Sequence, residues 1–256
     1  MKRFCFTVDD NIRCLQELTE GSFDSIFDHP YLAMYRRLHE KHGLKVQLNL
    51  FYEAGSFDLA QVTDRYRTQW ADNCHWLKLS FHSRLENEKP YEFSGYDEVF
   101  TDCGNVHRQI CRFASPAALG KTTTVHYCLA TPEGLQALKD NGVQGLLGLY
   151  GTAEQPRSSY QTNAADGDRI RAGGIVCDDG ICCAGIDIVM NDCTREEILS
   201  RLQALSGRAL VKVMIHEQYF YPDYPKYQPD FEEKLDAAFI FLMENGFESA
   251  FFEECL

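Results

Sequence analysis

One stretch near the N-terminus decides how the chain is interpreted: Phe4-Cys5-Phe6-Thr7-Val8-Asp9-Asp10. Its large apolar residues alternate with smaller or polar ones, which is the pattern of a buried strand whose tip carries two acids. Buried charge is costly unless it is paired or bound to a cation, so Asp9 and Asp10 indicate a metal ligand and a neighbouring base. The alternative is a turn in which the same residues cap the following helix. Polar clusters at other strand ends favour the metal site over the cap.

The composition describes a globular protein and argues against two classes of partner. The chain has 256 residues, of which 45% are hydrophobic, enough for one large domain or two small ones. A net charge of -13 and the lack of any Lys/Arg run argue against nucleic acid and against an anionic membrane surface. No stretch approaches the roughly 18 apolar residues of a membrane span, and no long apolar segment follows the N-terminus. Neither a span nor a signal peptide is predicted.

The 11 cysteines are spread along the chain without a Cys-x-x-Cys pair. Their odd number and the lack of an export signal predict reduced thiols and a cytoplasmic location. A zinc site made of Cys177, Cys182, Cys183 and Cys193 is an alternative, but vicinal cysteines chelate one metal poorly. We therefore expect several of these thiols to behave as small buried hydrophobes.

Strand-like and helix-like segments alternate through most of the chain. The expected strands are residues 2–8, 44–51, 76–81, 122–127, 146–150, 209–215 and 248–252. Such alternation implies a mainly parallel sheet, because crossover helices must cover its faces. The number of units favours a closed barrel over an open sheet, and no Gly-rich phosphate loop follows the first strand. We predict the α/β class, as a (β/α) barrel of seven or eight mainly parallel strands.

Residues 151–192 interrupt this alternation. They are rich in Gly, Ser, Asp and Asn, and residues 174–182 have the pattern of a β-hairpin around an Asp-Gly turn. We predict one barrel domain over residues 1–256, with residues 151–192 as a hairpin-bearing insertion on its rim.

Histidines stand at the ends of three of the expected strands. They are His82, His126 and His216, while Asp9 and Asp10 follow the first strand. In a barrel, functional groups gather at the C-terminal ends of the strands. A single histidine there is more often structural, but several that converge with two carboxylates match the donors of a divalent metal site. We predict that these five side chains face one pocket.

At these positions the chain resembles the polysaccharide deacetylases, carbohydrate esterase family four, which are glycoside hydrolase/deacetylase β/α barrels. Thr7-Val8-Asp9-Asp10 matches the family's Thr-Phe-Asp-Asp motif, and Val213-Met214-Ile215-His216 matches its apolar strand ending in Leu-x-His. His82-Ser83-Arg84-Leu85-Glu86 matches His-Ser/Thr-x-x-His except at its last residue. His126-Tyr127-Cys128-Leu129 stands in place of the family's Arg-x-Pro-Tyr motif. Residues 244–252 look like the turn and short strand that close the family's barrel.

The resemblance implies a metal-dependent hydrolase that removes N- or O-acetyl groups from a carbohydrate or a related small substrate, with amide C–N bonds as targets. It implies a divalent metal, zinc or else manganese, cobalt or nickel, held by Asp10, His82 and Glu86. Asp9 would be the base, and His216 would protonate the leaving group. The alternative is that Glu86 is an ordinary surface acid and the metal site is incomplete.

The remaining site residues have two interpretations each. His126 would join the catalytic set as a partner of Asp9 in place of the arginine, or supply a further metal ligand. The rings of Tyr127, Tyr219 and Tyr221 would bind a sugar by stacking, or would pack over the barrel mouth.

A different class of function is also open. The chain would then be an inactive or divergent barrel that binds a carbohydrate. It would otherwise be a glycoside hydrolase that pairs Asp9 with Glu217 or Glu86, because glycoside cleavage needs two carboxylates. A stoichiometric divalent ion distinguishes the deacetylase from both.

Overall fold

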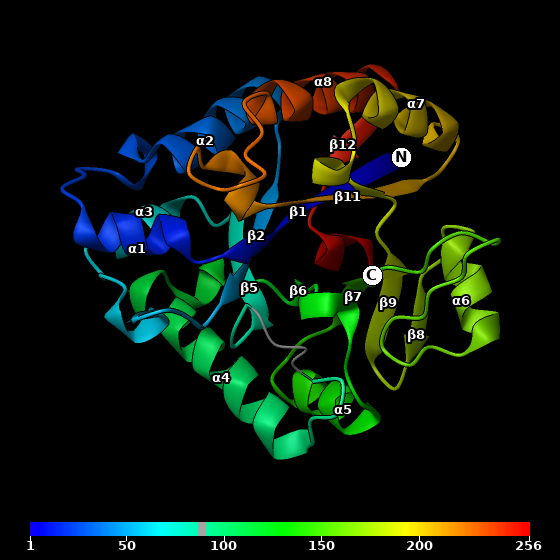
Figure 1. The fold of residues 1–256 in the computed structure, drawn as a ribbon, viewed down its shortest axis with the longest axis horizontal. Helices are drawn as coiled ribbons and strands as arrows, with labels where there is room; N and C mark the ends of the chain where they lie inside the picture. The colour runs from blue at the N-terminus through cyan, green and yellow to red at the C-terminus, as the bar shows by residue number, and fades with distance from the viewer. Residues whose placement is uncertain (87–90) are drawn as a thin grey trace.

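The computed structural model describes residues 1–86 and 91–256, with a central, mainly parallel sheet that helices cover (Figure 1). The strands are β1 (Lys2–Asn11), β2 (Val46–Phe51), β3 (Glu53–Ala54), β4 (Phe57–Asp58), β5 (Leu77–Ser83), β6 (Thr122–Thr123), β7 (Gly145–Gly148), β8 (Val176–Asp178), β9 (Ile181–Gly185), β10 (Ile188–Val189), β11 (Leu210–His216) and β12 (Phe247–Ser249). The α-helices are α1 (Arg13–Glu20), α2 (Pro30–His42), α3 (Arg67–Asp72), α4 (Tyr96–Phe113), α5 (Pro132–Asp140), α6 (Ala164–Arg171), α7 (Arg195–Leu205) and α8 (Phe231–Glu244). The predicted alternation of strands and helices is confirmed.

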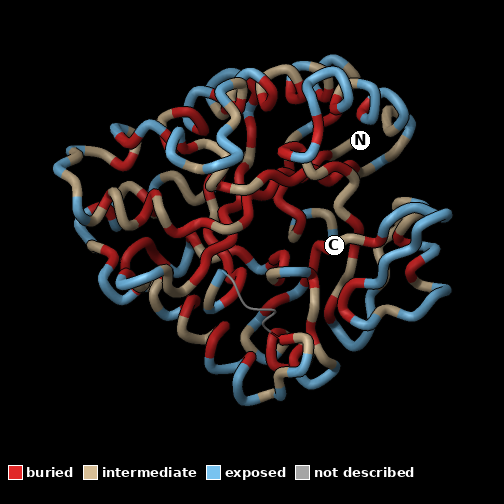
Figure 2. The backbone as a smooth tube through the Cα atoms, in the orientation of Figure 1, coloured by how far each residue is buried: buried red, intermediate tan, exposed pale blue. Residues whose placement is uncertain are grey.

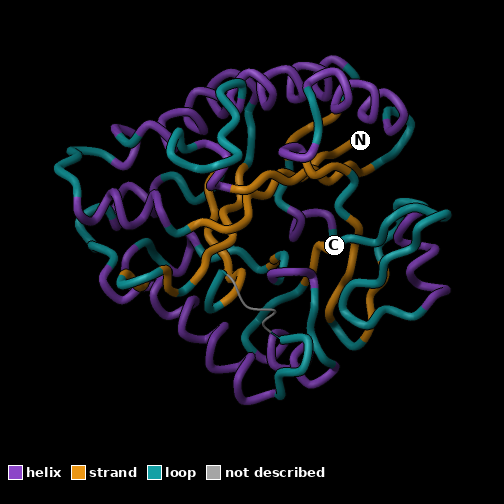
Figure 3. Tube along the Cα trace, viewed as in Figure 1, coloured by secondary structure: helices purple, strands orange, loops and turns teal. Residues whose placement is uncertain are grey.

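The strands pair in two runs that follow one another around the barrel. The first run is β10–β11–β1–β2–β5, all parallel, and β12 also pairs with β1. The second run joins β6, β7 and β9 in parallel and adds β8 antiparallel to β9. The two runs approach each other at two places. At one, β9 leads directly into β10; at the other, a single parallel bridge joins Leu79 of β5 to Leu119. Figure 3 shows these strands at the centre of the molecule, with helices outside them.

Alternation along β1 separates an apolar layer from a polar one. Phe4 and Phe6 pack against Phe239 of α8, with ring centroids 5.7 and 5.1 Å apart. Each fully buried aromatic side chain stabilises the fold by about 1.5–3 kcal/mol relative to exposure. Thr7 and Asp9 alternate with these residues and are also buried, as most of the central strands are (Figure 2). Both faces of the strand are thus buried, and its polar face requires polar partners.

The interior of the barrel supplies those partners. Gln47 Nε2 donates to the backbone carbonyl of Thr122 at 2.8 Å, and Ser80 Oγ donates to the same carbonyl at 2.7 Å. These buried hydrogen bonds run between β2, β5 and β6, across the gap that the single Leu79–Leu119 bridge leaves. Side chains therefore join the two runs of strands where the backbone ladder is short.

The hairpin predicted near residues 174–182 is present as β8 and β9, with Asp179 and Gly180 at its turn. Both turn residues have positive φ, at 42° and 83°, as an Asp-Gly hairpin turn requires. Only part of the segment lies apart from the sheet, because β9 pairs with β7 and β10 pairs with β11. Residues 151–192 therefore also contribute two strands to the barrel wall, and their status as an insertion remains a prediction.

The hairpin also carries a disulfide. Cys177 and Cys182 face each other across β8 and β9 and are bonded, with Cα atoms 4.0 Å apart. The prediction of reduced thiols is wrong at this pair. It failed because cysteine spacing alone does not reveal that the Asp-Gly turn brings the two residues opposite each other. Within the described ranges, 1–86 and 91–256, no helix combines the length and apolar character needed to cross a membrane.

Candidate metal centre

A bulge at the end of β1 presents two neighbouring carboxylates to the same site. The register between β1 and β2 shifts between Val8 and Asn11, and Asp10 has a φ of 63°. Left-handed backbone is uncommon for a non-glycine residue and is typical of a bulge that redirects a side chain. Asn11 holds the bulge, because its amide donates to the carbonyls of Val8 at 2.6 Å and Asn49 at 3.1 Å. A regular strand would have directed adjacent acids to opposite faces.

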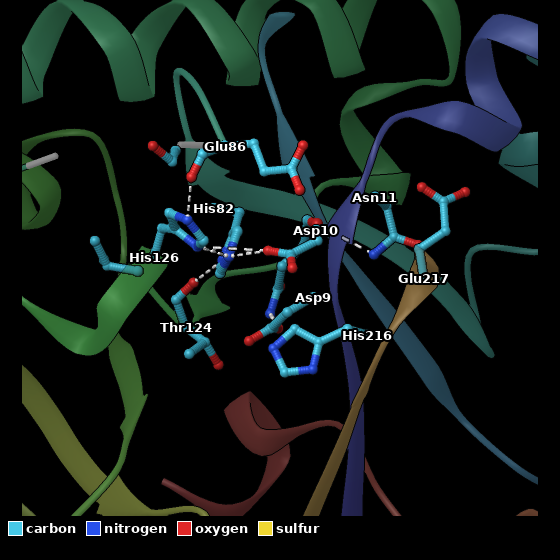
Figure 4. Close-up of polar contacts among 12 residues, drawn as sticks. Asp9, Asp10, Asn11, His82, Glu86, Thr124, His126, His216 and Glu217 are labelled. Carbon is cyan, nitrogen blue, oxygen red and sulfur yellow. Dashed lines mark hydrogen bonds and ion pairs between the residues drawn. The ribbon is translucent and has the colours of Figure 1, made fainter. Parts of the chain in front are cut away.

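Asp10 meets two histidines from different strand ends. Its Oδ1 lies 3.0 Å from His82 Nε2 and 3.4 Å from His126 Nδ1, and these two nitrogens are 3.0 Å apart (Figure 4). His82 is on β5, and His126 lies in a single 3-10 turn, His126–Cys128, after β6. Asp10 Oδ2 accepts a hydrogen bond from Gln218 Nε2 at 2.8 Å. The three facing atoms form a compact group of one oxygen and two nitrogens.

The outer ring nitrogens of both histidines are bonded to backbone carbonyls. His82 Nδ1 donates to Thr124, and His126 Nε2 donates to Glu86 at 2.5 Å. A carbonyl only accepts, so these contacts place the ring proton on the outer nitrogen of each neutral imidazole. When both imidazoles are neutral, the inner nitrogens face each other, and Asp10, through lone pairs. Such a trio needs a cation between its members, and its donor set fits a divalent metal such as zinc.

The pKa shifts indicate that His82 carries a second proton when no metal is bound, and its Nε2 then donates to Asp10. Burial opposes ionisation of Asp10, but the hydrogen bond and charge of His82 outweigh it, and the pKa of Asp10 lies below its usual value. Burial likewise opposes the charge on His82, but Asp9 and Asp10 raise its pKa above the usual value. Burial and the charge of His82 lower the pKa of His126 to about 4. His126 therefore stays neutral at neutral pH and keeps a free lone pair toward Asp10.

Asp9 occupies a separate position in the same site. Its Oδ1 accepts a hydrogen bond from Asn49 Nδ2 at 2.7 Å, and Asn49 Oδ1 in turn accepts from Gln47 Nε2 at 2.8 Å. Burial raises the pKa of Asp9, although the charges of His82 and His216 act in the opposite direction. The neutral side-chain amide of Asn49 thus orients Asp9. The arginine of the Arg-x-Pro-Tyr motif, which would be a charged partner, is absent from this sequence.

Sequence reasoning missed Asn49 and Gln47. Both lie at alternate positions of the expected strand 44–51, between apolar Val46, Leu48 and Leu50. The signal that could have identified them is the alternation itself. Apolar residues on one face of a strand indicate that the strand is buried, and polar residues on its other face then need polar partners inside the protein.

His216 lies next to Asp9 across the β1–β11 pairing, where the two residues are direct partners. Its Nδ1 is 2.7 Å from Asn191 Oδ1, which leaves Nε2 free of this contact. The ring of Tyr219 lies 6.1 Å from the ring of His216 between centroids. Asn191 follows β10, within the segment predicted as an insertion.

Glu86 and Tyr221 lie outside the trio of ligand atoms. The Glu86 side chain is exposed and, among the described residues, does not join the trio of ligand atoms, whereas its backbone carbonyl holds His126. Tyr221 is buried, its hydroxyl donates to Glu217 at 3.1 Å, and Arg13 stacks on its ring at 3.9 Å. Burial and the charge of Asp10 raise the pKa of Glu86, so its carboxyl lies near the trio, and its role as a ligand stays a prediction. Tyr127 is 42% exposed and lies beside His126, with ring centroids 4.2 Å apart.

Glu217 has a structural task. Its two oxygens accept the backbone amides of Ile12 at 2.8 Å, Arg13 at 3.0 Å and Cys14 at 2.8 Å. These amides open helix α1 and have no partner within the helix, so the carboxylate satisfies them and ties α1 to the end of β11. The carboxylate is thereby occupied, which removes it from an acid pair with Asp9.

Comparisons with known proteins support the fold. No family model matches the sequence, and no curated protein matches it either. A family 4 acetyl xylan esterase from Clostridium thermocellum, solved with a cobalt ion, is similar with a TM-score of 0.56 at 12% identity, over 99% of this chain and 89% of that one. The Bc1960 peptidoglycan N-acetylglucosamine deacetylase is similar with a TM-score of 0.56 at 9% identity, over 98% of this chain and 86% of that one.

A third structure shows that the fold alone does not select the reaction. A 4-alpha-glucanotransferase from Thermococcus litoralis is similar with a TM-score of 0.58 at 12% identity, over 99% of this chain but 40% of that one. At such identities a likeness shows the architecture only, and the chemistry must be argued from the site.

Proposed function

From a polysaccharide deacetylase-like fold of the carbohydrate esterase family 4 type, we propose that the chain is a metal-dependent hydrolase that removes acetyl groups from a carbohydrate or a related small substrate. The proposal rests on one observation, the meeting of Asp10, His82 and His126 with one carboxylate oxygen and two ring nitrogens within 4.8 Å of one another. His126 takes the place in the ligand set for which Glu86 was a candidate. The set is then one carboxylate and two imidazoles, which suits zinc, with manganese, cobalt or nickel as alternatives.

The residues around the trio have distinct tasks in such a reaction. When bound, a divalent ion supplies Lewis acidity toward the acetyl carbonyl and makes water a stronger acid. Asp9 accepts the proton of the attacking water, because Asn49 orients its carboxylate and burial raises its pKa. His216 donates a proton to the leaving nitrogen or oxygen, and Asn191 orients its ring. The rings of Tyr127 and Tyr219 stack on the sugar at the mouth.

The competing functions have less support. A glycoside hydrolase would need a second carboxylate opposite Asp9, and both oxygens of Glu217 are engaged by backbone amides. A barrel that only binds sugars would not need a trio of facing lone pairs. The predicted cytoplasmic location has an observation against it, because a disulfide at Cys177–Cys182 favours an oxidising compartment.

The test combines metal analysis with acetate release. The purified protein should bind one divalent ion per chain and release acetate from short N-acetylated or O-acetylated sugars, with both properties lost after chelation and restored by zinc or cobalt. Protein that binds no divalent ion at saturating concentration would contradict the proposal. Protein that binds the ion but releases no acetate from either substrate set would leave the sugar-binding alternative ahead.

A further inference from the structure

Tyr160 contacts the loop that carries His126 on both sides of that histidine. Its hydroxyl accepts a hydrogen bond from the backbone amide of Val125 at 3.1 Å, and its own backbone amide donates to the carbonyl of Cys128 at 3.1 Å. Val125 and Cys128 bracket the two residues, His126 and Tyr127, that lie between them. Tyr160 comes from residues 151–192, far along the chain from the histidine.

The loop needs such support because its backbone is strained. Tyr127 and Cys128 have φ values of 59° and 57°, two consecutive non-glycine residues in the left-handed region. Such a conformation is unfavourable for a residue with a side chain and persists only where the surroundings hold it. Cys128 is also bonded through its amide to the Val125 carbonyl at 2.7 Å, which closes the turn around His126.

Tyr160 is itself firmly held. It is 3% exposed, and its hydroxyl donates to the Leu147 carbonyl on β7 at 2.6 Å, so both hydrogen-bonding roles of the hydroxyl are used. The preceding residue, Ser159, accepts the Leu149 amide at 2.9 Å and donates to the Leu149 carbonyl at 2.7 Å. The buried Tyr160 hydroxyl therefore links β7 to the His126 loop, since it donates to Leu147 and accepts from Val125.

We propose that Tyr160 is a positioning residue of the metal centre, which holds His126 in place as the third ligand. The inference rests on the proposed function, since it assumes that the trio binds a metal. It gives residues 151–192 a role beyond the hairpin: they support the histidine that compensates for Glu86 at the end of the His82-Ser83-Arg84-Leu85-Glu86 motif. No charge or ligand atom of Tyr160 is involved, so its effect acts through geometry alone.

The experiment measures metal affinity with the chain intact. Zinc binding to the metal-free protein is followed by calorimetry, and cobalt binding by visible absorption, which reports the coordination geometry. Tyr160→Phe keeps the ring and removes the hydroxyl. We expect zinc affinity to fall by about 10–100-fold, as when an outer partner of a ligand is lost, with an altered cobalt spectrum.

Two control variants separate positioning from general destabilisation. Tyr150→Phe removes a hydroxyl that contacts Thr162 of residues 151–192 at 3.2 Å, and should leave zinc affinity within about twofold of wild type. Ile198→Val trims the buried side of α7 and should lower the urea concentration at the unfolding midpoint without changing zinc affinity. Ser159→Ala loosens the same anchor and should weaken zinc binding less than Tyr160→Phe does; it decides the question if Tyr160→Phe does not fold.

The outcomes distinguish the two proposals. Wild-type protein that binds no zinc or cobalt would overturn the metal centre and the role of Tyr160 together. Wild-type protein that binds zinc and loses affinity on His126→Ala, but not on Tyr160→Phe or Ser159→Ala, would overturn the role of Tyr160 alone. A fall in affinity of equal size for Tyr150→Phe or Ile198→Val would also overturn it, because the effect would then be one of stability.

Discussion

The half of the barrel made by β11, β1, β2 and β5 is held differently from the half made by β6, β7 and β9. The first has strands of seven, ten, six and seven residues joined by long parallel ladders, with a register shift near the ends of β1 and β2. The second has strands of two, four and five residues, and side chains such as Ser80 and Gln47 connect it to the first. We call these the regular half and the irregular half.

The proposed metal centre draws on both halves. Asp10 and His82 come from strand ends of the regular half, and His126 comes from a strained turn of the irregular half. Long ladders place strand ends by repetition, so motifs there keep their spacing. A short strand cannot do so, and the position of His126 depends on contacts from elsewhere in the chain. The comparison shows that strand pairing can fix the positions of some residues in a site, while the position of another residue depends on hydrogen bonds from a distant segment.

The largest expected effect lies in the regular half. Asp10→Ala or His82→Ala should abolish stoichiometric zinc binding and acetate release, because each removes a ligand whose partners remain buried. Asp9→Asn should retain zinc and lower the rate of acetate release by about 10²–10⁴-fold, the usual contribution of a general base. Elemental analysis beside an acetate assay checks both. Zinc loss in Asp9→Asn would contradict the division of the two acids into base and ligand.

The next effect compares the halves directly. His126→Ala should weaken zinc binding by more than the roughly 10–100-fold expected from loss of an outer partner, whereas Glu86→Ala should have little effect. The Glu86 side chain is exposed, and the carbonyl that holds His126 survives the substitution. Calorimetric titration with zinc measures both variants. The reverse order of affinities would restore Glu86 as the third ligand.

A smaller effect concerns the stability of the regular half. Glu217→Gln should lower the free energy of unfolding by roughly 1–3 kcal/mol, because a side-chain amide cannot accept all three backbone amides of α1. Zinc affinity should stay near that of wild type. Urea unfolding gives the first value, with exposed Glu196→Gln as the matched control. Unchanged stability with lost hydrolysis would instead make Glu217 a catalytic acid.

The smallest expected effect is the pH dependence of the metal-free protein. The pKa of Asp10 lies below its usual 3.8, so its contribution is present above that value and is lost as the pH falls through the lowered pKa. The pKa of His82 is raised above its usual 6.5, so its contribution is present below that value and is lost as the pH rises through the raised pKa. The pair should therefore stabilise the metal-free protein most between these two values.

Zinc should reverse the trend on the alkaline side, because deprotonated ligands bind it better. Urea unfolding at about pH 5.5 and about pH 8.5, with chelator or with zinc, measures the difference. His82→Gln should flatten the dependence of the metal-free protein, while exposed His75→Gln should not. A chelator-treated protein that gains stability toward pH 8.5 through His82 would contradict the charged Asp10–His82 pair.

Much of the regular half could be predicted from the sequence. The strand at residues 4–10, the position of His82 and the strand that ends at His216 all follow from period-two alternation and the strand–helix rhythm. These signals are local, because a buried strand between helices needs apolar residues at fixed intervals whatever its partners are. The hairpin around Asp179 and Gly180 was equally local, since turn chemistry selects it.

The sequence by itself determined the α/β class, the order of the strands along the chain, and the carboxylate and imidazole groups that stand at the strand ends. Only the tertiary structure decided which donors meet. It turned Asp10 inward through a left-handed bulge and directed His126 to Asp10. The physical reason is that side-chain direction in a bulge or turn depends on hydrogen bonds from distant residues. Tyr160 and Asn11 supply such bonds, and no periodicity along the chain encodes them.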